Sequence, residues 1–154
     1  MYSLRKIKTF AGHEGQGFNA ELLSDGKPVA LVIDSAQGGE FEYQWYGGGS
    51  VEMLKLREFA RAQPSARCGG IELAMDMDLY VGSLLDTHLE DRQKRTWCKT
   101  KCVFRLKGDK NGEYRTIPVP MNMRNQDFIA KCISRIKEKY GDNLEEILNE
   151  KYQV

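Results

Sequence analysis

The chain has 154 residues, of which 41% are hydrophobic and 29% are charged, and its 23 basic and 22 acidic residues leave a formal net charge of +1. This balance excludes long-range attraction to nucleic acid or to an anionic membrane, so any such contact needs a local patch. The length is typical of a single domain, here 1–154, and no apolar run approaches the roughly 20 residues that a membrane-spanning helix needs.

The first third of the chain predicts an antiparallel meander. Apolar and polar residues alternate in its segments, and the pair Asp25-Gly26 is a strong signal for a hairpin turn. Val29–Ile33 is continuously apolar, which indicates a central strand covered on both faces. The expected strands cover residues 4–10, 18–23, 29–33 and 41–45.

The middle third predicts two helices. Ser50 is a suitable N-cap for the first, and Pro64 ends it. After an extended segment over 71–75, a longer helix begins at Asp76 or Asp78 and ends near residue 97. Gly82 lies inside this helix and weakens it, so we expect close packing at that position.

The last third predicts a hairpin followed by two helices. Strands over 102–107 and 114–119 flank an Asn-Gly turn, and Asn125 or Gln126 opens a helix that ends at Tyr140. A short helix follows with Leu144, Ile147 and Leu148 facing inward. We therefore expect one α+β domain, in which antiparallel β-meander and hairpin strands pack with about three to four helices.

A glycine-rich loop after the first strand supplies the first candidate contact surface. Its candidate binding residues are His13, Glu14, Gln16 and Asn19. A histidine beside a carboxylate is able to perform acid–base chemistry, but the loop lacks the second histidine of a zinc helix. A strand rather than a helix follows the glycines, which is not the dinucleotide fingerprint. We favour the interpretation that the loop shapes the start of the next strand, and we assign no catalytic residue.

A basic segment near the end of the long helix supplies the second candidate surface. Its candidate binding residues are Arg92, Lys94, Arg95, Trp97, Lys99 and Lys101. Cations with one aromatic side chain suit nucleic acid, but cations also favour a helix C-terminus, and Trp97 fits equally well as a core residue. Basic residues of the C-terminal helix would extend this patch if the two segments meet: Lys131, Arg135, Lys137 and Lys139.

Two further patterns have a structural interpretation that we prefer. The stripe Phe41, Tyr43 and Trp45 resembles a base-stacking platform, but the neighbouring glutamates would repel phosphates, so we favour core packing. The exposed part of this strand is a third candidate contact surface. Cys98 and Cys102 form one loosely spaced pair, which is insufficient for a structural zinc site. We predict no metal and no cofactor.

The sequence predicts a cytoplasmic protein. Met1–Lys6 has no apolar segment behind its charges, so we expect no signal peptide. Without a secretory signal, the four cysteines are expected as reduced thiols.

Several stretches resemble small uncharacterised proteins of bacteriophages and prophages. The resemblance lies in residues 8–19, in Gly26–Ala30, in the pair Gly38-Gly39 and in the tail from 104 to 142. It implies a bacterial host cytoplasm and a small accessory protein, and it names no activity or catalytic residue.

Taken with the candidate surfaces, the resemblance favours a function in binding a host or phage macromolecule, first of all a protein. Inhibition of a bacterial defence system such as CRISPR-Cas is one such role. Nucleic-acid binding through the basic segment 92–101 is the alternative. An enzyme that acts on a nucleotide with His13 and Glu14 is the second alternative. The sequence leaves the oligomeric state open.

Overall fold

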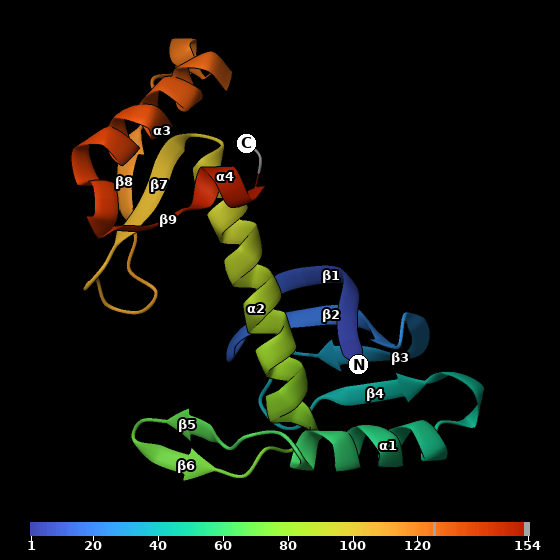
Figure 1. The fold of residues 1–154 in the computed structure, drawn as a ribbon. Coiled ribbons are helices and arrows are strands. Elements are labelled where there is room, and N and C mark those ends of the chain that lie inside the picture. The colour runs from blue at the N-terminus through green and yellow to red at the C-terminus, as the bar shows by residue number, and fades with distance from the viewer. Residues whose placement is uncertain (125, 153–154) are drawn as a thin grey trace. The chain divides into compact units, whose positions relative to one another are not determined.

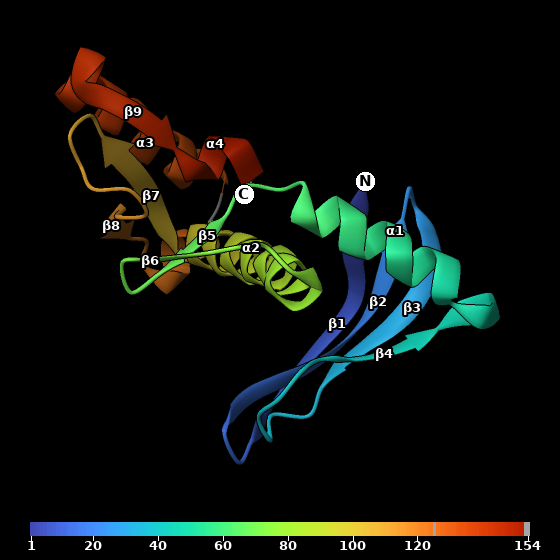
Figure 2. The same cartoon turned by 90° about the horizontal axis from the view of Figure 1, so that it is seen from below.

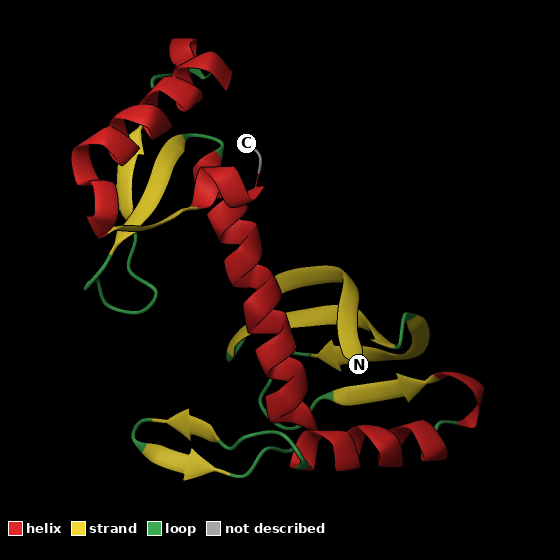
Figure 3. Cartoon of the chain, viewed as in Figure 1, coloured by secondary structure: helices red, strands yellow, loops and turns green. Residues whose placement is uncertain are grey.

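The computed structural model describes residues 1–124 and 126–152. The chain divides into two compact units, Met1–Thr87 and His88–Val154, each with its own sheet and core (Figure 1). Helix α2 (Met77–Cys98) contributes residues to both units. Helices and antiparallel strands together confirm the predicted α+β class (Figure 3). Asn125, one of the two predicted starts of the third helix, lies outside the described residues.

The first unit is built on a four-stranded antiparallel meander in the order β1-β2-β3-β4, as predicted. Its strands are β1 (Tyr2–Gly12), β2 (Gly15–Ser24), β3 (Lys27–Asp34) and β4 (Glu42–Trp45). Asp25 and Gly26 form the second turn with φ angles of 47° and 80°, the backbone that tight hairpins favour and that Asp-Gly pairs accommodate.

One face of this sheet carries the core of the first unit. Alternate residues of β2 and β3 are buried there, including Phe18, Leu22 and Val32. Helix α1 (Ser50–Arg61) lies across the strands (Figure 2). It adds Leu56 and other apolar side chains to the core. The unit also contains a short 3-10 turn (Tyr46–Gly48), a small hairpin of β5 (Ala66–Cys68) and β6 (Ile71–Leu73), and the first part of α2.

The expectation of close packing at Gly82 is wrong. A Cβ atom added at Gly82 would meet no heavy atom within 4 Å, apart from the backbone of its own helix and its chain neighbours. Gly12 in the first loop differs, because a Cβ there would lie 2.3 Å from the Cβ of Ala36. Gly12 therefore permits a close approach of two chain segments, whereas no other described segment approaches the helix closely at Gly82.

The second unit is a three-stranded antiparallel sheet in the order β8-β7-β9, covered by helix α3. Its elements are β7 (Lys101–Leu106), β8 (Arg115–Pro118), α3 (Gln126–Tyr140), β9 (Leu144–Ile147) and α4 (Leu148–Tyr152), with 3-10 turns at Met121–Met123 and Gly141–Asn143. The core joins Phe104 of β7 to Ile129 and Ile136 of α3.

The short helix predicted directly after Asp142 is partly wrong. Residues Leu144–Ile147 form β9, which pairs with β7, and a helix begins only at Leu148. Leu144 and Ile147 both pack into the core, because one extra residue in β9 shifts the register between them. In a regular strand these two positions would face opposite sides of the sheet.

A buried amide connects α4 to the rest of the second unit. Asn149 is 1% exposed. Its Oδ1 accepts a hydrogen bond of 2.8 Å from the N–H of Val103, and its Nδ2 donates to the carbonyls of Cys98 and Lys101 at 3.1 and 2.9 Å. This one side chain thus satisfies three backbone groups where α2 turns into β7.

The cysteines are unpaired and differ in exposure. Cys68 is exposed in the β5–β6 hairpin, Cys132 is half-buried on α3, and Cys98 and Cys102 are buried. In the described part of the chain, no group of three or more His, Cys, Asp or Glu side chains is placed to hold a metal ion. Among the described helices, none combines the length and the apolar character that crossing a membrane requires.

Candidate functional site

The predicted loop surface lies mainly at the tip of the β1–β2 hairpin. His13 and Glu14 are the two turn residues between the paired Gly12 and Gly15, and both side chains are exposed. The Glu14 N–H donates a hydrogen bond of 2.9 Å to the carbonyl of Ala36, which ties the tip to the β3–β4 connection. Gln16 is also exposed at this end. The tip is therefore a projecting turn.

Asn19 lies apart from these residues, on the sheet surface. It is paired with Lys8 of β1 and Ile33 of β3. Its Oδ1 atom is buried and accepts no hydrogen bond from the described residues. It lines a shallow depression together with Lys6, Lys8, Glu21, Leu31 and Tyr46.

The basic segment is largely engaged in contacts within the second unit. Arg95 forms an ion pair of 2.8 Å with Asp91, and its guanidinium lies 5.0 Å from the centre of the Tyr152 ring. Lys94 lies 3.9 Å from a carboxylate oxygen of Glu90. Each acid precedes its partner by four residues, which is the spacing that joins side chains along a helix.

The other residues of the basic segment are divided between surface and core. Trp97 is half-buried against the small core cluster of Cys98, Val103 and Leu148, as its core interpretation predicts. Arg92 and Lys99 are exposed, and Lys101 is half-buried at the start of β7. The segment thus presents fewer unpaired cations than its sequence indicates, which weakens the electrostatic basis of nucleic-acid binding.

The first unit contains a pocket of about 460 Å³, which we call the aromatic pocket. Side chains from β4 and the two residues before it, from α1, and from the start of α2 and the residue before it line this pocket. They are Glu40, Phe41, Tyr43, Trp45, Met53, Arg57, Arg61, Asp76, Met77 and Asp78. Phe41, Tyr43 and Trp45 belong to the aromatic stripe, whose exposed part was a predicted contact surface, whereas no lining residue belongs to the glycine-rich loop or to the basic segment.

The aromatic stripe of β4 forms part of the pocket and part of the core. The rings of Tyr43 and Trp45 stack with their centroids 5.5 Å apart and an angle of 12° between their planes. Phe41 meets the buried Phe18 edge to face, with centroids 5.1 Å apart. All three stripe residues are half-buried. The core interpretation is therefore correct only in part, because the stripe also lines an open pocket.

Asp78 holds the aromatic strand against the start of α2. Its carboxylate accepts hydrogen bonds of 2.8 Å from the backbone N–H of Phe41 and from the phenol of Tyr43. Burial, followed by this bond to Asp78, raises the pKa of Tyr43 above its ordinary value. Asp76 accepts a hydrogen bond of 2.8 Å from the N–H of Leu79 and so caps the helix.

The wall formed by α1 carries two arginines. Met53, Arg57 and Arg61 follow one another at intervals of four residues, so they form a single stripe along the helix. Both arginines are exposed, and within the described residues neither forms an ion pair or a side-chain hydrogen bond. Acidic side chains line the same pocket without pairing with them. The arginines therefore remain available to a ligand.

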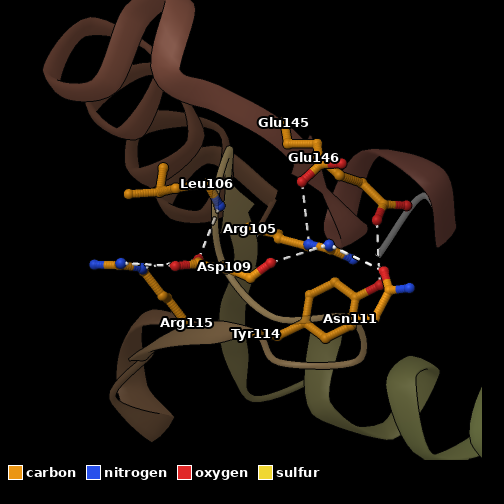
Figure 4. Close-up of polar contacts among 8 residues, drawn as sticks. All are labelled: Arg105, Leu106, Asp109, Asn111, Tyr114, Arg115, Glu145 and Glu146. Atoms are coloured by element: carbon orange, nitrogen blue, oxygen red, sulfur yellow. Dashed lines mark hydrogen bonds and ion pairs between the residues drawn. The ribbon is translucent and has the colours of Figure 1, made fainter.

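A second polar cluster, in the β7–β8 hairpin, serves the architecture of the second unit (Figure 4). Asp109 accepts hydrogen bonds of 2.8 and 3.0 Å from Arg115 and one of 3.0 Å from the N–H of Leu106. The Nε of Arg105 lies within ion-pair distance of Glu145 at 3.1 Å, but without hydrogen-bond geometry. These contacts close the hairpin and connect it to β9.

The bond from Arg115, followed by the one from Leu106, lowers the pKa of Asp109 to about 2. Because its charge is fully compensated by Arg115 and by the backbone, Asp109 is suited to holding the loop and not to proton transfer at neutral pH.

Comparison with known proteins gives no relative from which residue roles could be transferred. No protein-family model matches the sequence, and neither a curated protein nor a solved structure matches the chain. Within the described residues, the aromatic pocket brings aromatic, sulfur-containing and charged side chains together.

Proposed function

We propose that this protein acts by binding another protein and that the aromatic pocket is its contact surface. The observation that carries this proposal is the convergence of Tyr43 and Trp45 with Arg57 and Arg61 around one open pocket. Tyrosine, tryptophan, methionine and arginine are enriched in protein interfaces, and the first two together with arginine dominate binding hot spots. Met53 and Met77 add adaptable apolar surface beside them.

The charges of the pocket specify the partner further. Arg57 and Arg61 have no carboxylate partner within the described residues, so their planar guanidinium groups are able to take carboxylates of the partner. The stacked rings offer a flat apolar surface for a neighbouring side chain. A segment with a carboxylate close to a large apolar side chain therefore fits this pocket best.

The proposed setting is the cytoplasm of a bacterial host, in which the chain would act as a small accessory protein of the phage type. The resemblance of residues 8–19 and of the tail to phage and prophage proteins supports this setting. A component of a bacterial defence system, such as a CRISPR-Cas effector, is the partner that we propose to test first.

A quantitative pull-down from bacterial lysate tests the proposal. The tagged chain is compared with an Arg57→Glu/Arg61→Glu variant and with a matched Lys27→Glu/Arg67→Glu control, which changes the charge of the same unit equally at exposed positions. We expect the wild type and the control to recover the same partner, and the pocket variant to recover it about tenfold less well or worse, as loss of a hot spot implies.

Circular dichroism establishes that all three proteins are folded. Equal recovery by the pocket variant and the wild type, or recovery of nothing above background by the wild type, contradicts the proposal. Addition of purified CRISPR-Cas effector complexes to the same assay decides whether they are the partner.

A further inference from the structure

The second unit has a groove between its edge strand and its main helix. A cavity of about 190 Å³ lies there, which we call the α3–β8 groove. Its walls come from β8 and α3, and its lining residues are Ile117, Cys132, Arg135, Ile136, Lys139 and Tyr140. β8 is at the edge of the sheet order β8-β7-β9, so no further strand of the described chain covers this side.

The floor of the groove is apolar, and the chain that follows β8 carries further exposed hydrophobic side chains. Ile117 is 41% exposed although it faces the helix side of the sheet, opposite the buried Cys102. The connection from β8 to α3 adds Met121 and Met123, which are 79% and 42% exposed. Contiguous exposed apolar surface marks interaction sites, and methionine adapts well to different partners.

Arg135 and Lys139 line the groove and belong to a stripe of cations on α3. Lys131, Arg135 and Lys139 follow one another at intervals of four residues along α3, so they project on one side of the helix. Within the described residues none of the three forms an ion pair with a carboxylate, although Glu138 is exposed on the same helix and the Nζ of Lys139 lies 5.2 Å from the centre of the Tyr140 ring. By contrast, the Nζ of Lys137 lies 2.6 Å from a carboxylate oxygen of Glu150.

We propose that the α3–β8 groove binds an acidic amphipathic segment of a protein partner. A large apolar side chain of this segment occupies the cavity beside Ile117 and Tyr140, and carboxylates on either side of it pair with the cation stripe. Charge complementarity selects an acidic segment, because three neighbouring cations without a carboxylate partner would repel a basic one. The site belongs to the second unit and does not depend on the function proposed for the aromatic pocket.

A protein segment fits this groove better than a single-stranded nucleic acid. Stacking platforms for bases need exposed aromatic rings, whereas the floor here is formed by isoleucine and cysteine. The one aromatic side chain of the lining, Tyr140, packs against Phe104 with ring centroids 5.3 Å apart, so its ring is engaged in the core. The cations alone would suit phosphates, and the experiment therefore includes DNA.

Selection from a random peptide display library tests the proposal. The target is the full chain carrying Arg57→Glu and Arg61→Glu. These substitutions remove the two cations of the aromatic pocket, so that acidic peptides are not selected by that pocket. We expect the selected peptides to combine aspartate or glutamate with a leucine, isoleucine, phenylalanine or tryptophan. Binding should move the NMR amide signals of Ile117, Cys132 and Ile136.

The charge requirement is tested with matched triple variants in the same background. Lys131→Glu/Arg135→Glu/Lys139→Glu should weaken binding of the selected peptides about tenfold or more, as loss of complementary charges does. The control Lys107→Glu/Lys110→Glu/Lys151→Glu has the same charge change at exposed positions of the same unit and should bind as before.

Three results would overturn the assignment. The first is a set of selected peptides without an excess of acidic residues, and the second is equal peptide binding by the two triple variants. The third is a single-stranded DNA oligonucleotide that binds through the three cations with steep salt dependence, and that the selected peptides do not displace. The last result would assign the groove to nucleic acid instead.

Discussion

The phenol of Tyr43 donates a hydrogen bond of 2.8 Å to the carboxylate of Asp78, which connects strand β4 to the first turn of α2 across 35 residues of sequence. The same carboxylate also accepts the N–H of Phe41, so a single acid positions the whole aromatic strand. The aromatic pocket exists in its present shape because this acid fixes one of its walls relative to the others.

Removal of the phenol should destabilise the first unit and change its response to alkali. Tyr43→Phe should lower the free energy of unfolding by about 1 kcal/mol, the usual contribution of one hydrogen bond. The pKa of Tyr43 is raised in the folded protein, so this stability is present below the ordinary tyrosine pKa of 10.0 and is lost as the pH rises above it. The decrease in the free energy of unfolding at alkaline pH should therefore be smaller in Tyr43→Phe than in the wild type.

Urea unfolding between about pH 9 and about pH 11 checks both parts of this prediction. Trp45 lies in the first unit and Trp97 in the second, so a Trp97→Phe background leaves one fluorophore that reports the first unit. Identical alkaline losses with and without the phenol would contradict the assignment of the raised pKa to Tyr43.

Asp109 should titrate well below an ordinary aspartate. Its pKa is lowered to about 2, first by the hydrogen bond from Arg115, so its contribution to stability is present above the ordinary value of 3.8 and is lost as the pH falls through about 2. Carboxyl carbon NMR should therefore show a low pKa in the wild type. Arg115→Gln should move the pKa back toward 3.8, whereas Lys110→Gln in the same loop should not.

Asn149 should be essential for the stability of the second unit. Asn149→Ala leaves the N–H of Val103 and two backbone carbonyls without their partner, at a cost of about 3 kcal/mol or more in the free energy of unfolding. Asn149→Asp keeps an acceptor for Val103 but removes both donors, and it should also be destabilising. Unfolding followed by Trp97 fluorescence in a Trp45→Phe background measures this loss. A change below about 1 kcal/mol would show that water replaces the amide.

Gly82→Ala should stabilise the protein. The position is helical, and an added Cβ would meet no heavy atom within 4 Å apart from its own helix backbone and chain neighbours. Alanine favours the helix over glycine by about 0.5–1 kcal/mol, so the melting temperature should rise. A lower melting temperature would contradict the prediction, because it would show that the added methyl group clashes with a neighbouring atom. Calorimetry of the two proteins provides the comparison.

The parts of the fold that depend on local sequence patterns were predictable. Alternation and the Asp25-Gly26 turn identify the meander, because a strand and its neighbour in sequence are also neighbours in the sheet. The error at Leu144–Ile147 has a physical cause. A three-residue spacing of inward side chains is typical of a helix, and here an extra residue in β9 produces the same spacing in a strand. The partner strand β7 lies far away in sequence, so no local pattern reveals it.

The candidate sites were less predictable than the fold. The aromatic stripe was visible in the sequence, but its meeting with Arg57 and Arg61 depends on how α1 lies on the sheet. The i, i+4 spacing of the arginines beside Met53 was the one available signal. Conversely, the basic segment was conspicuous in sequence, yet Asp91 and Glu90 precede its cations by four residues and pair with two of them.

The different surroundings of the cysteines have a practical consequence. Cys68 is exposed in the β5–β6 hairpin, whereas burial raises the pKa of Cys98 to about 11 and that of Cys102 to about 12. Because the thiolate is the reactive form, a maleimide dye at neutral pH should couple to Cys68 well before these two thiols. With Cys132 replaced by serine, the protein should accept a single fluorophore or surface anchor on its first unit, ready for binding measurements on individual molecules.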